Sequence, residues 1–547
     1  MTEFLIANMA PLMFASLVVF LLFGFPVAFA LAANGILFGL IGIELGLLHG
    51  ALFQALPERI FGIMANDTLL AVPFFTFMGL ILERSGMAED LLDTIGQLFG
   101  PVRGGLAFAV IFVGALLAAT TGVVAASVIS MGLISLPIMM RYGYDHRLAT
   151  GVIAASGTLA QIIPPSLVLI VMADQLGRSV GDMYQGALLP GLMLTSMYVL
   201  YVAAVAIFRP SMAPAMPVEA RTLRQDDGSS GLRSLGVLFA LSVAGAWLFA
   251  NQIYTESAPR DEVVVVSSMV GIGIAFVAAL GNRLLGLGML SRMAERVTFV
   301  LIPPLGLIFL VLGTIFIGVA TPTEGGAMGA MGALLMALSR KRLSMPLLKQ
   351  AMDSTTKLSC FVVFILIGSS VFGLTFRGVD GDLWVEHLMT SLPGGQTGFL
   401  VAVNILVFIL AFFLDYFELA FIIVLLLAPV ADKLGIDLIW FGVLLAVNMQ
   451  TSFLHPPFGF ALFFLRSVAS EKVKTASIYW GAVPFVIIQL VAVGLIIAFP
   501  GIVSYGDKGA KAVPQEELRL DQLLQDGGSG AAADQSASDL LRQLQGN

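Results

Sequence analysis

Two proline pairs stand inside long apolar segments of this chain. Pro164-Pro165 lies in SGTLAQIIPPSLVLIVMA, and Pro456-Pro457 lies in NMQTSFLHPPFGFALFFLR. Proline cannot donate the helical hydrogen bond, so carbonyl oxygens about one turn earlier lose their partners. In lipid such oxygens are costly unless they line a cavity or bind a ligand. Because Na⁺ and other hard cations bind carbonyl and hydroxyl oxygens, the two breaks indicate cation sites.

The first proline pair has hydroxyl residues and glycines nearby that could complete such a site. The apolar stretch 106–140 is interrupted by Thr120-Thr121-Gly122, and residues 157–161 supply the carbonyls that the prolines free. We predict that this interruption and the helix break meet. The candidate residues of this first sodium or substrate site are Thr120, Thr121, Gly122, Ser127, Gly157, Thr158, Pro164, Pro165 and Ser166. The structural alternative is a kink that serves only packing.

The second proline pair follows an apolar stretch with ionisable groups at its middle. Residues 396–430 are interrupted by Asp415-Tyr416-Phe417-Glu418. Ionisable groups at membrane depth are costly and usually functional, although a tip that reached the outer headgroups would simply be solvated. His455 could couple protons by titrating, or it could only donate a hydrogen bond to a freed carbonyl. The candidate residues of this second sodium or substrate site are Asp415, Glu418, Asn448, Thr451, Ser452, His455, Pro456 and Pro457.

A third polar element, GVATPTEGGAMGA, contains Thr321, Pro322, Thr323 and Glu324. Thr321 suits a helix N-cap, Pro322 suits the first turn, and Glu324 stands three residues after the cap, as in a capping box. The small residues that follow allow helices to pack closely. We therefore interpret this segment as a structural helix start, with a face that suits either a scaffold interface or the wall of a site.

An internal repeat relates the two proline pairs. A shift of 292 residues places the first pair on the second, and it also matches residues of identical type at Gly86, Asp90, Pro101, Pro137, Gly143 and Asp145. The same shift places the interrupted stretch 106–140 on 396–430, and we predict that both are re-entrant hairpins. Paired, interrupted membrane segments in two halves of one chain are typical of secondary transporters.

Composition identifies the class of protein. The chain has 547 residues, of which 58% are hydrophobic and 12% charged, and its mean hydropathy is +0.96. Continuous apolar runs such as 186–208 and 481–499 are close to the length that a helix needs to cross ~30 Å of hydrocarbon. These runs do not alternate with period two, which excludes a membrane barrel. Cys360 is the single cysteine, so disulfide frameworks and cysteine metal clusters are absent.

Basic residues set the predicted orientation. With the N-terminus outside, 19 of the 28 Lys and Arg residues fall in cytoplasmic loops, as the positive-inside rule requires. Seven predicted crossings separate the starts of the two repeats. Because seven is odd, the repeats are inverted relative to each other and their hairpins open to opposite sides. The hairpin tips are then expected near the midplane, and both termini are expected outside.

The chain divides into four predicted regions. The regions are a membrane repeat at 1–208, an insertion at 209–298, a second membrane repeat at 299–502 and a tail at 503–547. The first repeat contains the hairpin 106–140 and the broken helix 148–176. The second repeat contains the hairpin 396–430 and the broken helix 439–465. The insertion is a polar loop followed by an extra helical pair that has no repeat partner. The tail is rich in Gly, Ala, Gln and Asp, a composition that favours flexibility.

Several motifs occur together: AATTGVVAAS followed by PIMMRYGYD, then GTLAQIIPPS, GVATPTEGGAMGA, FFLDYFELAF, APVADKLGID and NMQTSFLHPPFG. Together they resemble the large, DctM-like permease subunit of tripartite ATP-independent periplasmic (TRAP) transporters, over about 9–208 and 299–500. The resemblance implies an all-α, elevator-type secondary transporter in the bacterial inner membrane, with Na⁺ as coupling ion and no organic cofactor. It also implies a periplasmic binding protein that delivers a substrate, usually an organic acid, and a separate small four-helix membrane subunit. We expect no nucleic-acid partner.

The chain departs from the family pattern at three points. The first hairpin often reads Ser-Gly-Ser in the family but reads Thr121-Gly122-Val123 here, so one hydroxyl is lost. His455 stands where Thr is common. The insertion 209–298 exceeds the common size and could replace or extend contacts with the small subunit.

Other function classes fit less well. An enzyme is not expected, because HExxH and GxSxG motifs are absent and the four histidines are too far apart in sequence to form a local metal cluster. The absence of a Walker motif argues against an ATP-driven pump. A channel fits the inverted repeats less well than alternating access does. A stand-alone anion or proton-coupled transporter of similar fold stays open as the alternative, and the need for a binding protein distinguishes it.

Overall fold

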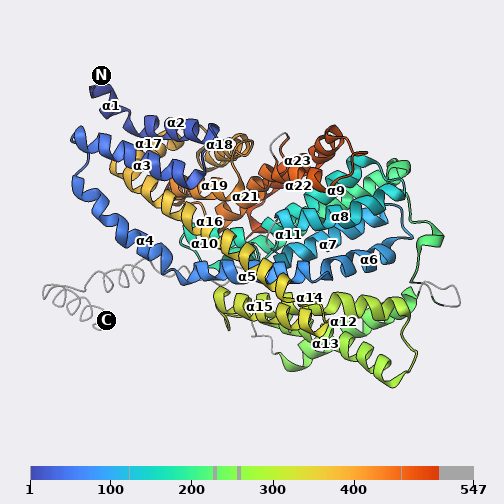
Figure 1. Cartoon of the computed structure of the whole chain (residues 1–547). Coiled ribbons are helices and arrows are strands. Elements are labelled where there is room, and N and C mark those ends of the chain that lie inside the picture. The colour runs from blue at the N-terminus through green and yellow to red at the C-terminus, as the bar shows by residue number, and fades with distance from the viewer. Residues whose placement is uncertain are drawn as a thin grey trace, which may run out of the picture. The chain divides into compact units, whose positions relative to one another are not determined.

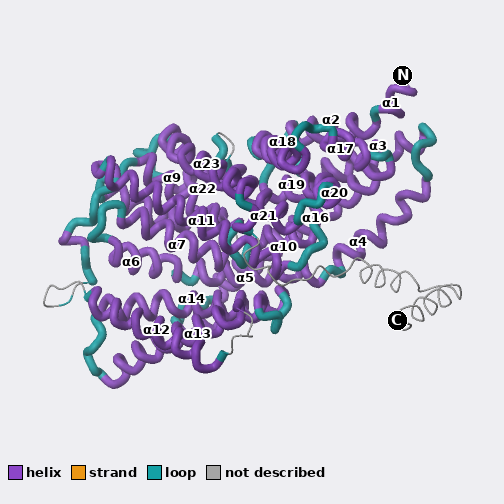
Figure 2. Tube along the Cα trace, turned by 180° about the vertical axis from the view of Figure 1, so that it is seen from behind, coloured by secondary structure: helices purple, strands orange, loops and turns teal. Residues whose placement is uncertain are grey.

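The computed structural model is helical throughout the residues that it describes, which are 2–121, 124–223, 225, 231–254, 260–456 and 459–503 (Figure 1). Eight of these helices are long and apolar enough to cross a membrane, judged by length and composition, or up to ten if each of two bent helix pairs is one span. Seen from behind, the described part of the chain again consists of helices and loops alone (Figure 2). The prediction of an all-α, polytopic membrane protein is confirmed.

The first half of the chain forms the helices up to residue 208. They are α1 (Thr2–Ala7), α2 (Met9–Leu22), α3 (Val27–Glu44), η1 (Gly50–Ala55), α4 (Leu56–Met64), η2 (Asp67–Leu70), α5 (Ala71–Arg84), α6 (Met87–Phe99), α7 (Gly105–Thr121), α8 (Val124–Arg141), α9 (His146–Thr158), η3 (Leu159–Gln161), α10 (Leu167–Gln175) and α11 (Val180–Phe208). The first proline pair thus separates α9 and η3 from α10.

The second half begins with η4 (Pro210–Met212) and η5 (Val218–Ala220) and continues through a longer series. The helices are α12 (Leu232–Ile253), α13 (Arg260–Leu285), α14 (Arg292–Phe316), α15 (Pro322–Ser339), α16 (Met345–Gly378), α17 (Gly381–Thr390), α18 (Gly395–Leu410), α19 (Tyr416–Leu419), the π-helical η6 (Ala420–Val424), α20 (Leu425–Lys433), α21 (Leu438–Met449), η7 (Gln450–Phe453), α22 (Phe460–Val468), α23 (Thr475–Ala498) and η8 (Pro500–Ile502). Here the break lies between η7 and α22.

The same turn starts α9 and α21, which the internal repeat places at equivalent positions. Gly143 has a φ of +80° and Gly435 a φ of +71°, a conformation that favours glycine. Two residues later an aspartate caps the helix: Asp145 accepts a hydrogen bond from the Arg147 backbone N–H at 2.8 Å, and Asp437 accepts one from Trp440 at 2.7 Å. The repeated sequence therefore produces the same local structure in both halves.

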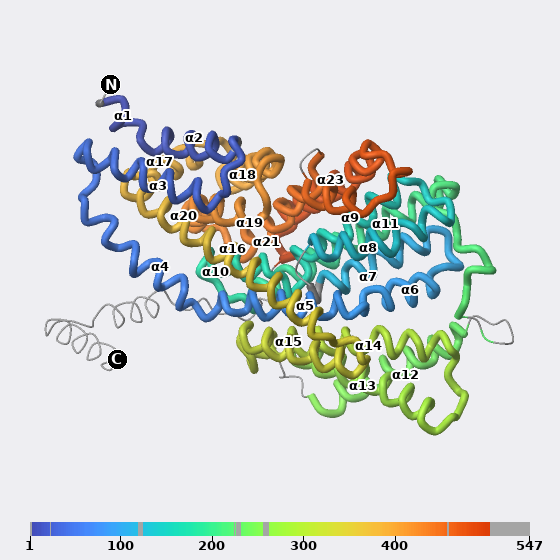
Figure 3. Tube along the Cα trace, in the orientation of Figure 1, coloured from blue at the N-terminus to red at the C-terminus, as the bar shows by residue number. Residues whose placement is uncertain are grey.

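Contacts between helices define two groups, whose members can be located in Figure 3. In the frame (α2–α5 and α14–α16), α5 packs along α15, and α16 packs along α3. Glycines allow close approach: a Cβ on Gly35 of α3 would lie 2.7 Å from the Val371 carbonyl oxygen of α16. In the hairpin bundle (α7–α11 and α18–α23), α9 packs along α23 and α11 along α21.

Two seams between the frame and the hairpin bundle are formed by α5 and by α16, and α14 also contacts α7 and α11. In Figure 1, α5 lies between α15 of the frame and α7 of the hairpin bundle, and it contacts both. On the other seam α16 contacts η6, where the Ser369 hydroxyl donates a hydrogen bond to the Phe421 carbonyl at 3.2 Å. Such π-helical turns often mark functional sites, because they displace one residue from the helical ladder.

The inserted helices α12 and α13 pack on each other and on α14. The structure starts α14 at Arg292, inside the stretch assigned to the insertion, because the Ser291 hydroxyl caps the helix by accepting from the Ala294 N–H at 3.1 Å. The structure also describes residues 209–223 of the loop before α12. Its backbone bonds to the base of the hairpin bundle, with the Ala213 carbonyl accepting from Gly104 N–H at 2.9 Å and the Met212 carbonyl from Asp145 N–H at 3.0 Å. The predicted tail, apart from Val503, lies outside the described residues.

Candidate functional site

The first helix break is buried over its whole length. Residues 148–173 are all shielded from solvent, and the Pro164-Pro165 bond is cis. One freed carbonyl is satisfied locally, because the Ser166 hydroxyl donates to the Gln161 carbonyl at 2.8 Å. The Gln161 side-chain oxygen and the Ser156 hydroxyl are buried, and neither has a hydrogen-bond partner among the residues that the structure describes. This break therefore offers oxygen ligands that are unused within the described part of the chain.

The hairpin formed by α7 and α8 packs directly on this break. A Cβ on Gly157 would lie 2.3 Å from the Val128 Cγ2 of α8, and a Cβ on Gly114 of α7 would lie 2.6 Å from the Ser156 Cβ. Ser127, the neighbour of Val128, is fully buried. The structure thus places α8, which carries Ser127, against Gly157 through Val128. Gly122 lies outside the described residues, and so do the side chains of Thr120 and Thr121.

The second helix break has its own buried polar set. Asn448 donates to the Asn404 carbonyl at 2.8 Å and to the Asn404 side-chain oxygen at 2.9 Å, which ties α21 to α18. The Thr451 hydroxyl donates to the Asn448 carbonyl at 2.7 Å. The Ser452 hydroxyl is buried and has no hydrogen-bond partner within the described ranges. Pro456 follows in the described chain, whereas Pro457 lies outside it.

His455 lies among aromatic rings, not among acids. Its ring stacks on Phe412 with centroids 4.1 Å apart and meets the edge of Phe408 at 4.5 Å. The backbone of Ala411 is close to the ring, but in the described part of the chain neither ring nitrogen has a hydrogen-bond partner of normal geometry. The packing joins the second helix break to the end of α18.

Asp415 and Glu418 form a capping box at the start of α19. The Asp415 carboxylate accepts from the Glu418 N–H at 2.8 Å, and the Glu418 carboxylate accepts from the Asp415 N–H at 2.8 Å. The pair therefore has a structural function that the sequence analysis did not assign. Each carboxylate has a second oxygen, so capping does not exhaust its capacity to bind a cation.

The segment Thr321–Glu324 is placed in the frame. The predicted capping box is present at the start of α15, with Thr321 accepting from the Glu324 N–H at 3.2 Å. The Thr323 hydroxyl donates to the Asp67 carbonyl at 2.7 Å. Since α15 packs on α5, α14 and η2, this segment fits a structural role and is not grouped with either helix break.

A buried bridge between the two breaks was missed by sequence reasoning. The Gln489 amide of α23 donates to the Tyr198 hydroxyl of α11 at 3.0 Å and to the Gln450 side-chain oxygen of η7 at 3.4 Å. The Tyr198 hydroxyl also bonds the side chain of Thr158, next to η3. All four residues are 0% exposed. A single glutamine within the apolar run AVPFVIIQLVAVGLIIA was the signal that could have revealed it.

The described residues contain no group of three or more His, Cys, Asp or Glu side chains that could hold a metal ion. What the two breaks present instead is amide, hydroxyl and backbone oxygen, at two repeat-equivalent places that are connected through Gln489. Such uncharged oxygens suit a weakly held, exchangeable monovalent cation better than a tightly bound transition metal.

Comparison with known proteins identifies the family. The model of the DctM component of the tripartite ATP-independent periplasmic transporter matches residues 14–502. The C4-dicarboxylate TRAP transporter large permease protein DctM of Pseudomonas aeruginosa is 27% identical over 452 residues, which cover 82% of this chain and 88% of that protein. The ectoine TRAP transporter large permease protein TeaC of Halomonas elongata is 24% identical, over 91% of this chain and 98% of that protein.

A third relative is longer than this chain. The sialic acid TRAP transporter permease protein SiaT of Haemophilus influenzae is 23% identical over 83% of this chain but only 62% of that protein. A solved structure, the Alcanivorax borkumensis YdaH transporter, has a TM-score of 0.49 at 14% identity over 84% of this chain and 91% of that chain, a likeness too weak to support a conclusion. The family match over residues 14–502 is decisive, and this chain belongs to the DctM component family of tripartite ATP-independent periplasmic transporters.

Proposed function

We propose that this chain is the translocation subunit of a Na⁺-coupled, binding-protein-dependent secondary transporter that imports an organic acid. Relatives named for C4-dicarboxylates, sialic acid, isethionate and ectoine support a small polar or anionic solute. The proposal places the chain in the bacterial inner membrane, with its N-terminus and C-terminal tail on the periplasmic side. That orientation follows from the distribution of basic residues.

The observation that carries the proposal is the pair of buried helix breaks with unpartnered oxygens. At the first break Ser156 and Gln161 have oxygens without partners among the described residues, and at the second Ser452 has such an oxygen. Leaving such groups buried and unpaired costs about 1–3 kcal/mol each. A bound Na⁺ or a polar substrate would satisfy them. We assign Na⁺ to the two breaks, with hydroxyl and carbonyl oxygens as ligands, and the organic acid to the space between them.

Alternating access is supported by the packing of helices that the internal repeat relates. The 292-residue shift places α5 on α16 and α3 on α15. The contact between α5 and α15 is therefore the repeat equivalent of the contact between α16 and α3. Two halves with matching contacts favour inverted repeats, which exchange conformations between outward-open and inward-open states. We propose that the hairpin bundle moves as one elevator-like body against the frame.

The proposed cycle gives the polar groups distinct roles. Na⁺ at the first break would be held between Ser127 and the carbonyls near Gly157, because α8 packs directly on that segment. At the second break the Asp415–Glu418 capping box would fix the hairpin tip, with Asn448, Thr451 and Ser452 nearby in sequence to supply neutral oxygens. The Gln489 bridge would keep the two sites in register as the bundle moves.

Two partners belong to the proposal. A periplasmic binding protein would deliver the solute, and a small four-helix membrane subunit would brace the frame. The longer relatives support the second partner, since a permease named DctMQ is matched over only 62% of its length. The extra pair α12–α13 packs on α14 and is otherwise largely exposed, so it could extend the surface that meets the small subunit.

The test is uptake of a radiolabelled organic acid, beginning with a C4-dicarboxylate, into proteoliposomes that contain this chain and its small subunit. We expect uptake only with an inward Na⁺ gradient and the binding protein present. Uptake without the binding protein, or with a proton gradient alone, would instead favour a stand-alone or proton-coupled transporter. Ser452→Ala and Thr121→Ala should weaken sodium dependence, while Ser196→Ala, on the exposed side of α11, should not.

A further inference from the structure

Glu83 is a largely buried acid that the proposed transport cycle does not use. It is the penultimate residue of α5, where the frame meets the hairpin bundle. Its Oε1 accepts a hydrogen bond from the Ser130 hydroxyl of α8 at 2.7 Å. Its Oε2 is closed off from solvent and has no hydrogen-bond partner among the described residues. An ionised carboxylate with one bare, buried oxygen is costly, and a proton on that oxygen removes the charge.

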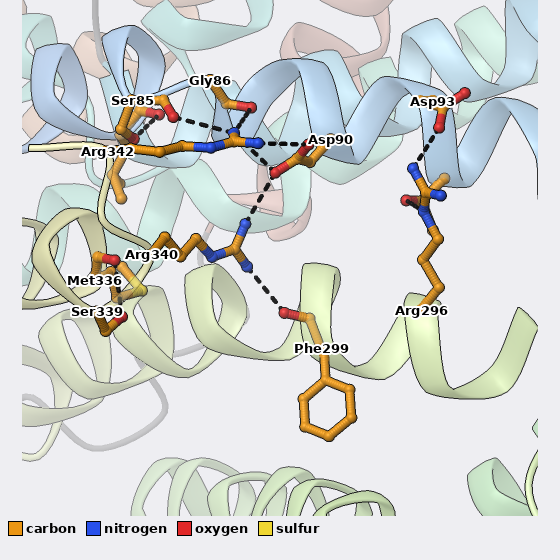
Figure 4. Close-up of polar contacts among 12 residues, drawn as sticks. Ser85, Gly86, Asp90, Asp93, Arg296, Phe299, Met336, Ser339, Arg340 and Arg342 are labelled. Carbon is orange, nitrogen blue, oxygen red and sulfur yellow. Dashed lines mark hydrogen bonds and ion pairs between the residues drawn. The ribbon is translucent and has the colours of Figure 1, made fainter. Parts of the chain in front are cut away.

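The end of α5 is held firmly in the frame (Figure 4). The Arg342 guanidinium donates to the Ser85 carbonyl at 3.1 Å and to the Gly86 carbonyl at 3.0 Å, shortly after Glu83 in sequence. Arg342 and Arg340 both pair with Asp90 of α6, at 2.9 and 3.2 Å. We call these five residues the corner clasp. It attaches the connection between α5 and α6 to the connection between α15 and α16.

Ser130 lies on the opposite side of the seam. It belongs to α8, whose neighbouring residue Val128 is packed against Gly157 of the first helix break. Any movement of the hairpin bundle against the frame therefore moves Ser130 and leaves Glu83 in place. The hydrogen bond between them cannot survive a displacement of several ångströms, because such bonds weaken steeply beyond about 3.2 Å.

Arg84 is the charged neighbour whose positive charge favours the ionised form of Glu83. The Arg84 guanidinium, however, donates hydrogen bonds to Gln350 and Ser354 of α16, at 3.2 and 3.0 Å. The segment α7 contains no charged residue. The charged residues on the other elements packed against α5 are Asp67 of η2, Glu89, Asp90 and Asp93 of α6, Arg141 of α8, Asp174 of α10, Glu324 of α15, and Lys349, Asp353, Lys357 and Arg377 of α16.

We propose that Glu83 is a proton-binding gate, and that α8 moves along α5 only while Glu83 carries a proton. The inference rests on the proposed alternating-access function. When Glu83 is ionised, Ser130 stabilises its charge, and withdrawing Ser130 would leave the carboxylate without that donor inside the seam. A proton delivered by a hydronium ion forms one O–H bond on the carboxyl group, releases water and neutralises the charge.

The corner clasp makes this gate different from proton coupling. Because the clasp keeps Glu83 in the frame, the proton is taken up from one side of the membrane and returned to the same side. In the predicted orientation that side is the cytoplasm, since Arg84 and the corner clasp fall among the basic cytoplasmic loops. The proton is therefore not transported, and the pH on the cytoplasmic side alone should control the transport rate.

The test is Na⁺-driven uptake of a C4-dicarboxylate into proteoliposomes of uniform orientation, with the pH of the lumen and the bath set separately. For the wild-type chain with its small subunit and binding protein, we expect the rate to fall as pH rises on the cytoplasmic face only. Glu83→Gln mimics the protonated acid and should abolish this dependence. Ser130→Ala removes the donor whose withdrawal is costly only while Glu83 is ionised, so this variant should also lose most of the pH dependence. The exposed control Glu89→Gln should behave as wild type.

The outcomes separate the inference from the proposed function. A wild-type protein without Na⁺-dependent uptake contradicts the proposed function itself. A Glu83→Gln protein whose uptake keeps the wild-type pH profile overturns the gate, and so does equal sensitivity to pH on both faces. If Glu83→Gln gives no folded protein, the pH profile of Ser130→Ala decides, and a wild-type pH profile there also overturns the gate.

Discussion

Gly157→Ala tests whether hairpin contact with the first helix break matters for sodium binding. The added Cβ would lie 2.3 Å from the Val128 Cγ2, where about 3.4 Å or more is ordinary, so α8 or the break must move by about 1 Å. Overpacking of this kind costs about 1–3 kcal/mol, and the gain in helix propensity from glycine to alanine returns less than about 1 kcal/mol. We therefore expect the sodium half-saturation concentration of uptake to rise by about five- to a hundredfold.

A second substitution makes this prediction specific. Val128→Ala removes the atom that collides with the new methyl group, and the remaining contacts of the Gly157 Cβ are with the Val128 backbone at 3.4 and 3.5 Å. The double variant should therefore recover most of the lost sodium affinity. Gly306→Ala is a matched control, since a Cβ there meets nothing within 4 Å. Wild-type sodium dependence in Gly157→Ala, or no recovery in the double variant, would refute the reasoning.

Three further predictions concern the second break and the bridge. Asp415→Asn keeps an oxygen that can cap α19 but loses the charge, so we expect weaker sodium dependence of uptake at an unchanged melting temperature. Asp415→Ala should lower both the sodium dependence and the melting temperature. Equal sodium dependence in Asp415→Asn and wild type would limit this residue to capping. Gln489→Leu leaves the Tyr198 hydroxyl and the Gln450 oxygen without their donor and should lower the free energy of unfolding by about 1–3 kcal/mol. In thermal unfolding, the combined loss of stability with Tyr198→Phe should be smaller than the sum of the two single losses. Full additivity would mean that the bridge is not one unit. His455→Phe preserves the stacking on Phe412 and should leave the pH profile of uptake unchanged, and a lost pH response would restore His455 as a proton-coupling residue.

Much of the fold was accessible from sequence because its signals are local. The proline pairs, the internal repeat and the apolar runs each act through backbone chemistry that holds in any surroundings. The start of α15 was predicted from Thr321 and Glu324 for the same reason, and the capping box is there. Asp415-x-x-Glu418 has the same capping-box spacing, but in an apolar segment the two charges indicated a binding site, and the capping role was not predicted.

What sequence could not supply are the contacts between distant segments. The bridge from Gln489 to Tyr198 joins residues 291 positions apart, and the hydrogen bond from Ser130 to Glu83 joins two sides of a seam. Neither hydrogen bond follows from periodicity. The packing of the whole frame and hairpin bundle decides which face of α23 or α8 meets each partner. The same holds for the contacts that Met212 and Ala213 make with the hairpin bundle, because the composition of this segment predicted only a polar loop.

The crossed pairing of the frame also has a consequence for how the protein is made. Since α5 needs α15 and α3 needs α16, the first half of the chain contains long helices whose packing faces have no partner until residue 378 has been synthesised. During that interval the ribosome adds roughly 300 residues, which at about 5–20 residues per second takes a quarter of a minute or more. The glycine-lined face of α3 therefore stays uncovered by protein in the bilayer during this time. Lipid or an insertion factor must cover it until the second half of the permease has been synthesised.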